Sequence, residues 1–151
     1  MDTITWQCKH FNELNLHDLY AIIKLRNEVF VVEQNCVFQD ADDKDIYCYH
    51  LSGTVSNNEL AAYARLVPAG ISFPYISIGR VVTSPACRNQ GLGRALMTQA
   101  IDECYWLFGK QSIKIGGQLY LKNFYQSFGF KQTSEMYLED NIPHIEMLLE
   151  P

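Results

Sequence analysis

Seven residues near the middle of the chain, Arg88 to Arg94, have the types and spacing of a phosphate-binding loop. They read Arg-Asn-Gln-Gly-Leu-Gly-Arg, follow an apolar strand-like run from Ile76 to Thr83, and open a helical pattern from Leu92 to Leu107. The first N–H groups of a helix lack intrahelical partners and carry the positive end of the helix dipole, so anions bind there. The sequence therefore predicts a site for a phosphate-bearing ligand at this loop.

The spacing of the glycines separates three kinds of phosphate loop. A P-loop ends in Gly-Lys followed by Ser or Thr, whereas the Gly-Lys pair at 109–110 is followed by Gln111. A dinucleotide-binding loop needs a third glycine where this chain has Leu96. The pattern Arg/Gln-x-x-Gly-x-Gly/Ala is matched at every position by residues 88–93. The spacing thus favours the third kind of loop.

A second motif, Leu121 to Phe130, reads Leu-Lys-Asn-Phe-Tyr-Gln-Ser-Phe-Gly-Phe. The two motifs, in this order and with a strand between them, resemble the GNAT superfamily of N-acetyltransferases. Their first motif binds the pyrophosphate of coenzyme A, and their second places an Asn and a Tyr beside the pantetheine and the thioester sulfur. The segments 25–36, 78–82 and 139–145 resemble the ElaA-type branch of this superfamily, so the resemblance covers nearly the whole chain.

The resemblance implies an acetyl-CoA-dependent N-acetyltransferase that acts on an amine of a small molecule or a protein. The phosphates would lie on the N–H groups of the loop, with two arginine side chains adding charge. The pantetheine arm would pair with the backbone of Val81 and Thr83, and the N–H of Val82 would polarise the thioester carbonyl. The predicted donor-binding residues are Val81, Val82, Thr83, Arg88, Asn89, Gln90, Gly91, Leu92, Gly93, Arg94 and Asn123.

Tyr125 is the predicted general acid, because a phenol near the sulfur can give a proton to the departing thiolate. The general base stays open between two residues. Glu33 ends the first helical segment, which lines the acceptor side in this family, and His144 starts the last strand. A histidine titrates in the useful range, but His50 ranks behind both because a histidine within a strand-like run is commonly structural.

The cysteines and the acidic segment offer no competing chemistry. Five cysteines, an odd count with no Cys-x-x-Cys pair, argue against a disulfide framework and a zinc site. Cys36 and Cys87 have no histidine nearby in sequence to serve as a base, so direct attack by the amine is expected. In the acidic segment, a calcium loop would need Gly and Glu where Asp45 and Leu51 stand. We expect no metal there and a solvated acidic loop.

The elements that position these residues alternate along one predicted domain, residues 1–151. The unit from Ile76 to Gly117 must be parallel with a right-handed crossover, while the flanking hairpins are antiparallel. The predicted fold class is α/β, with a GNAT-like mixed, mostly antiparallel sheet, a central parallel strand–helix–strand unit and helices on both faces. Expected strands are 3–9, 47–55, 60–67, 75–83, 113–117, 130–138 and 144–149, and expected helices are 16–29, 92–107 and 119–128.

The bulk composition limits the partners. A net charge of -5 and a pI near 5.3 provide no basic surface for nucleic acid. No apolar run approaches the roughly 20 residues that span a bilayer, and the N-terminus does not have the pattern of a signal peptide, so we expect a cytoplasmic protein that binds no membrane. A homodimer is compatible with the sequence but not required by it.

Two other functions compete with acetyl transfer. The Arg-x-x-Val-Phe pattern from Arg26 to Phe30 is similar to one in the acyl-homoserine-lactone synthases, which take acyl chains from a carrier protein. A non-catalytic CoA-binding sensor would also keep the phosphate loop. The complete loop at residues 88–93 favours free CoA as the donor, and the sequence does not identify the acceptor or the physiological role.

Overall fold

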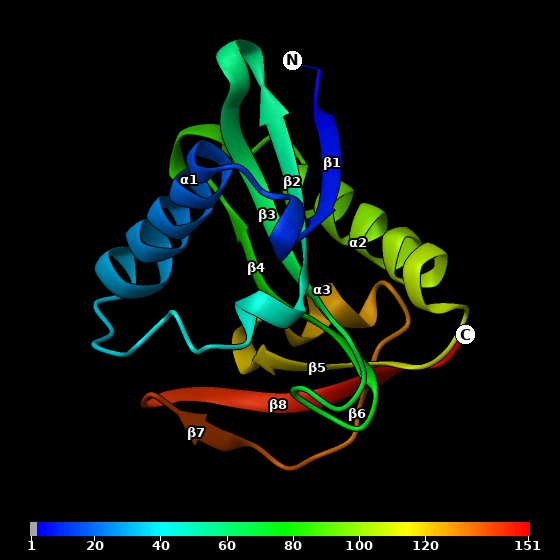
Figure 1. Ribbon diagram of the computed structural model, residues 1–151. Helices are drawn as coiled ribbons and strands as arrows, with labels where there is room; N and C mark the ends of the chain where they lie inside the picture. Colours follow the sequence, from blue (N-terminus) through cyan, green and yellow to red (C-terminus); the bar gives the residue numbers. More distant parts are fainter. Residues whose placement is uncertain (1–2) are drawn as a thin grey trace.

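The computed structural model describes residues 3–151. One eight-stranded sheet has the order β1-β2-β3-β4-β5-β8-β6, with β7 paired to β8, and helices cover both faces (Figure 1). The strands are β1 (Thr5–His10), β2 (Tyr49–Val55), β3 (Glu59–Val67), β4 (Ile76–Thr83), β5 (Ile113–Gln118), β6 (Lys131–Gln132), β7 (Tyr137–Glu139) and β8 (Ile142–Leu149). The α-helices are α1 (Leu16–Arg26), α2 (Leu92–Phe108) and α3 (Lys122–Gln126), and a π-helix, η2 (Asn27–Glu33), continues α1.

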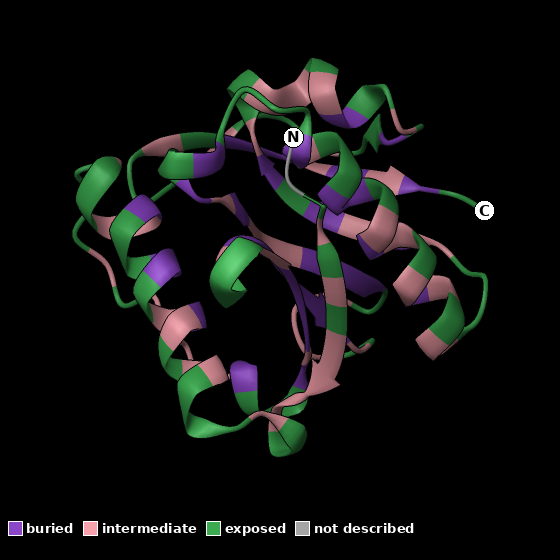
Figure 2. Cartoon of the chain, turned by 90° about the horizontal axis from the view of Figure 1, so that it is seen from above, coloured by how far each residue is buried: buried purple, intermediate pink, exposed green. Residues whose placement is uncertain are grey.

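Apolar residues at helical spacing decide which face of each helix meets the sheet. On α2, Leu96, Ala100 and Cys104 are fully buried in the main core, which also includes residues of α3. On the opposite face of the sheet, Ile22 and Leu25 of α1 belong to a smaller core. Figure 2 shows the buried sides of these helices turned toward the sheet. The sheet is therefore covered on both sides, as the sequence predicts.

The parallel pair at the centre of the sheet is short. β4 and β5 are paired only at Ile76 with Ile113 and at Ser77 with Lys114. Beyond this point β5 keeps its antiparallel partner β8, and β4 keeps β3. The two central strands therefore diverge toward their C-terminal ends (Figure 1), which leaves one backbone edge of each strand without a strand partner.

β4 contains a β-bulge near the point where it leaves β5. Opposite the single residue Ala64 of β3, β4 places both Arg80 and Val81. Arg80 has a φ of 51°, in the left-handed region that residues with a Cβ rarely adopt. Bulges bend a strand and change the direction of its backbone groups, and they are common beside active sites.

The predicted parallel unit from β4 through α2 to β5 and the antiparallel β2–β3 hairpin are both confirmed. The first helix does not fray after Val29 as expected, but continues as a π-helix to Glu33. The expected strand 130–138 is two short strands, because the N–H of Thr133 bonds to the carbonyl of Glu146 and the chain turns away after it. None of the five cysteines, which all lie within residues 3–151, forms a disulfide. Between residues 3 and 151, no helix is long and apolar enough to cross a membrane.

Candidate active site

A cleft of about 1100 Å³ occupies the space where β4 and β5 diverge. One side is formed by residues 77–83 of β4 and the other by residues 115–118 of β5. We also name two walls of the cleft, each of which includes residues beyond these strands. The α2 wall comprises residues 81–83, the loop 88–91, the first turn of α2, and Tyr125. The second, the aspartate wall, comprises residues 33–45, Arg65, Arg80 and the β7–β8 hairpin.

The backbone edge of β4 faces the cleft beyond the point where β5 leaves it. The N–H of Ser84 donates to the carbonyl of Ala61 on β3 at 2.8 Å. Because N–H directions alternate along a regular strand, the N–H of Val82 also faces β3 and that of Thr83 faces the cleft. Val81 adjoins the bulge and has no register partner on β3. The prediction that the Val82 amide polarises a carbonyl therefore does not fit the geometry. Val81, one residue closer to the bulge, also lines the cleft.

The N-terminal end of α2 has the geometry that an anion site requires. Its N-cap is Gly91, in the left-handed region with a φ of 71°, and no side chain caps this end. The N–H groups of Leu92, Gly93 and Arg94 thus remain available to an anion. Gly93 lines the cleft, whereas residues 89–92 lie beside it rather than in its lining.

The two arginines of the loop are engaged with protein groups. Nη1 and Nη2 of Arg88, which lines the cleft, donate to both carboxylate oxygens of Glu33 at 2.8 and 2.7 Å. Arg94 donates to the hydroxyl of Ser127 at 2.8 Å and lies over the ring of Phe128, 4.7 Å from its centroid. Arg94 therefore ties α2 to the end of α3, while Arg88 spans the cleft mouth.

Tyr125 lies in the α2 wall beside β5, and its ring packs where Gly117 of β5 has no side chain. A Cβ on Gly117 would lie only 2.9 Å from Cε2 of Tyr125. Tyr125 is buried and lines the cleft, and burial raises its pKa to about 12, so the phenol is protonated at neutral pH. Asn123, predicted beside it, is exposed and is not among the lining residues.

His144 lies on the opposite side of the cleft, on β8. Its Nδ1 is 2.7 Å from the carbonyl oxygen of Ile142, to which it donates a hydrogen bond, and its Nε2 is 3.4 Å from a carboxylate oxygen of Glu139. The ring stacks on Tyr137 with centroids 5.9 Å apart. With a proton on Nδ1, the Nε2 atom of the neutral ring carries the lone pair and lies beside the Glu139 carboxylate.

The other two candidate bases are less well placed. Glu33 is exposed, and its hydrogen bond to Arg88 lowers its pKa, which weakens it as a base. His50 is buried between the hydroxyl of Tyr63 at 2.7 Å and the carbonyl of Asp45 at 2.9 Å, and burial lowers its pKa. Both ring nitrogens of His50 are used, and it is not among the residues that line the cleft. His144 fits the role best.

Three arginines and three aspartates on the aspartate wall form a closed ring of ion pairs. Each aspartate bridges two arginines, and each arginine bridges two aspartates, with N···O distances of 2.8 to 3.3 Å. The formal charges cancel, and we call this cluster the aspartate ring. Its order is Arg26, Asp40, Arg80, Asp42, Arg65, Asp45 and back to Arg26.

The ring is largely removed from solvent. Arg26 is 0% exposed and Arg65 is 3% exposed. Burial alone would raise the pKa of Asp42, but the hydrogen bonds and charge of Arg65 and Arg80 outweigh it and lower the pKa to about 2. The pKa of Asp45 is lowered in the same way, against its burial, by two arginines. The expectation of a solvated acidic loop is therefore wrong.

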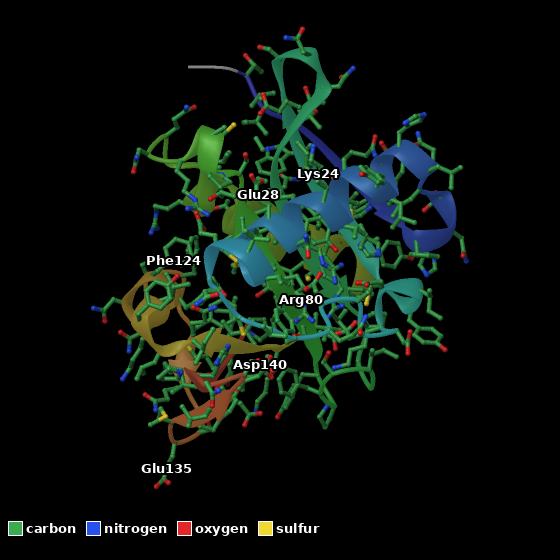
Figure 3. The ribbon with its side chains drawn as sticks, turned by 90° about the vertical axis from the view of Figure 1, so that its left-hand side faces the viewer. Lys24, Glu28, Arg80, Phe124, Glu135 and Asp140 are labelled. Carbon is green, nitrogen blue, oxygen red and sulfur yellow. The ribbon has the colours of Figure 1, made fainter. Side chains whose placement is uncertain are left out.

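The ring connects four parts of the chain. Arg26 ends α1, Arg65 is in β3, Arg80 forms the bulge of β4, and the three aspartates belong to the segment 40–45. Figure 3, seen from the α1 side, shows Arg80 below the helix, and both Arg80 and Asp140 of the β7–β8 turn line the cleft. The segment after the π-helix is thus fixed to the sheet at the point where the cleft opens.

A family model described as "Acetyltransferase (GNAT) domain" matches residues 27–151. This chain belongs to the GNAT acetyltransferase family. It is 43% identical over 149 residues to protein ElaA of Escherichia coli, covering 97% of each chain. The crystal structure of that ElaA has a TM-score of 0.91 and covers 98% of this chain and 100% of its own.

One further structure places the chain among acyltransferases, and a second shares its fold. An acyl-CoA N-acyltransferase from Pseudomonas aeruginosa has a TM-score of 0.93 and 40% identity, covering 97% of this chain and 99% of its own. The yncA protein of Salmonella typhimurium, solved with acetyl-CoA, shares the fold with a TM-score of 0.72 at 20% identity, covering 98% of this chain and 94% of its own. This GNAT protein is thus an acyltransferase.

The GNAT motifs lead to the α2 wall and miss the aspartate ring. Two of the ring arginines stand in otherwise apolar stretches, as Arg65 does between Ala64 and Leu66, and Arg26 follows the apolar helical positions Ile22 and Leu25. A charged residue is almost never fully buried unless it is paired. Two such arginines, together with three aspartates within residues 40–45, are the sequence signal that could have predicted buried pairing.

Proposed function

We propose that this GNAT protein transfers an acetyl group from acetyl-CoA directly to an amine. The observation that carries the proposal is the divergence of β4 and β5 beside the uncapped N-terminal end of α2. It combines an anion site with a free strand edge in one cleft. The loop amides would hold the pyrophosphate, and the edge of Val81 and Thr83 would pair with the pantetheine amides.

The residues of the cleft divide the chemistry of transfer among them. His144 Nε2 takes a proton as the amine nitrogen forms its bond to the thioester carbonyl carbon. The N–H of Val81 donates to the carbonyl oxygen, on which negative charge develops. As the carbon–sulfur bond breaks, the phenol of Tyr125 gives its proton to the thiolate, and the phenolate then regains a proton as His144 releases the one it took, so both groups return to their starting states. The products are an amide and free CoA, and no covalent enzyme intermediate forms.

Binding and turnover test the donor. Acetyl-CoA should raise the melting temperature of the protein, since a ligand that binds only the folded state stabilises it by mass action. Release of the CoA thiol over a panel of amines, with acyl carrier protein thioesters as a competing donor, should show acetyl-CoA as the preferred donor. Neither stabilisation nor thiol release with any CoA thioester would contradict the proposal.

Tyr125→Phe tests the mechanism. Removing one phenol oxygen should lower kcat about 100-fold, the range for general acid catalysis, with the KM for acetyl-CoA within about twofold. The matched control is Tyr105→Phe, since Tyr105 packs against the same core but does not line the cleft. Equal kcat in Tyr125→Phe and wild type would remove Tyr125 from the mechanism.

A further inference from the structure

Three members of the aspartate ring line the cleft, Asp42, Arg65 and Arg80, and Arg80 is the one that belongs to the bulge of β4. Its Nε donates to Asp40 Oδ1 at 2.8 Å, and its Nη2 donates to the carbonyl of Asp40 at 3.1 Å and to Asp42 Oδ2 at 3.3 Å. The guanidinium also lies 5.7 Å from the ring centroid of Phe38. Every one of these contacts comes from the segment after the π-helix, and none comes from the strands that flank β4.

The backbone of Arg80 needs such support. A φ of 51° is unfavourable for any residue with a Cβ, and residues held in such regions persist only when their surroundings over-determine them. The side-chain contacts of Arg80 hold its backbone in this conformation. Their partners are themselves fixed, because Asp40 is bonded to the fully buried Arg26 and Asp42 to the buried Arg65.

The residue that follows Arg80, Val81, lines the cleft and has no register partner on β3. The direction of the Val81 N–H depends on the bulge, since the extra residue shifts the register between β3 and β4 at this point. A hydrogen bond to developing negative charge is worth most when its donor is already oriented. Arg80, held by Asp40, Asp42 and Phe38 directly before Val81, would provide this orientation.

We propose that Arg80 is a positioning residue: clamped by Asp40 and Asp42 of the aspartate ring, it fixes the bulge that orients the Val81 amide toward the thioester carbonyl. The proposal rests on the function proposed above. It makes the acidic segment a part of the catalytic apparatus, although none of its carboxylates contacts the reacting atoms. It also explains why a non-glycine residue stands at a left-handed position.

Arg80→Gly separates the clamp from the backbone conformation. Glycine adopts a positive φ without strain, so the bulge stays accessible while the clamp is lost. We expect kcat to fall at least about tenfold, less than the roughly 100-fold or more for complete loss of an oxyanion donor because the amide itself is kept, with the KM for acetyl-CoA within about twofold. The matched control is Asn57→Gly, a change to glycine at a φ of 64° in the β2–β3 turn, which should leave kcat unchanged.

A readout without substrate keeps this test apart from the test of acetyl transfer. The ¹H–¹⁵N resonance of Val81 should shift and broaden in Arg80→Gly, whereas resonances in the β2–β3 turn should not. Arg80→Lys, which keeps the charge and one hydrogen bond, should restore part of kcat and serves if the glycine variant does not fold. An unmoved Val81 resonance, or kcat within twofold of wild type in both variants, would overturn the proposal. Failure of wild type to bind acetyl-CoA would instead contradict the proposed function.

Discussion

The two walls of the cleft are held in place by different interactions. The α2 wall is mostly continuous in sequence, since residues 81–94 provide the strand edge, the turn and the uncapped helix end. Its groups are mostly backbone amides, and the ion pair that joins it to the aspartate wall, Arg88 with Glu33, is exposed. The aspartate wall is built from side chains, and Arg80 and Asp40 meet across 40 positions of sequence.

This difference decides what each wall contributes. An anion site made of backbone amides needs only a turn and a helix start, which glycines encode locally. A ring of buried ion pairs needs each partner in place, because an unpaired buried charge is strongly unfavourable. The aspartate wall is thus expected to be the rigid side of the cleft, and the α2 wall the side that tolerates side-chain changes.

Arg26→Ala should break the aspartate wall most severely. It removes one arginine from both Asp40 and Asp45 at a position with 0% exposure. Removing one partner of a buried ion pair costs about 3–5 kcal/mol, because the other charge stays buried. Urea unfolding at pH 7 measures the loss.

The matched variant on the α2 wall is Arg88→Ala. Its ion pair with Glu33 is solvent-exposed, with side-chain exposures of 37% and 42%, so screening by water makes it weak. We expect a loss of at most about 1 kcal/mol, the usual limit for surface pairs. Similar losses in the two variants would show that the walls do not differ in rigidity.

Gly117→Ala should disturb the α2 wall at its most crowded point. The added Cβ would lie 2.9 Å from Tyr125 Cε2, so the ring must move. Overpacking of this kind costs about 1–3 kcal/mol, and displacement of the proposed acid should lower kcat at least about tenfold. The stability control is Gly79→Ala, where no atom lies within 4 Å of an added Cβ. A normal kcat in Gly117→Ala would show that the position of Tyr125 is unimportant.

Periodicity and turn residues were enough to predict most of the fold. The β4–α2–β5 unit had to be parallel because a helix connects its strands, and the structure confirms it. The π-helix at 27–33 was not predictable, since its residues have the same apolar spacing that an α-helix would have. The break between β6 and β7 depends on hydrogen bonds with residue 146, which no local pattern shows.

The site was predictable only as far as it is local. The loop before α2 and the motif around Tyr125 both led to residues that line the cleft, Gly93 and Tyr125 among them. The direction of the Val82 amide could not be read from sequence, because it depends on which residue forms the bulge. The aspartate ring joins α1, β3, β4 and a loop, so its partners become neighbours only after folding.

Acid should weaken the aspartate wall through Asp42. Its folded pKa of about 2 lies below the value near 3.9 of an unfolded aspartate, so its carboxylate contributes stability that is fully present above about pH 5 and is lost as the pH falls toward 2. In Asp42→Asn nothing titrates at this position, and the stability curve should be flatter by about 1 kcal/mol over that range once solvent screening is allowed for. Glu33→Gln, on the exposed pair, should change the slope less. Urea unfolding between pH 6 and 2.5 compares the three proteins, and parallel curves for wild type and Asp42→Asn would mean that the ring does not hold its aspartates ionised.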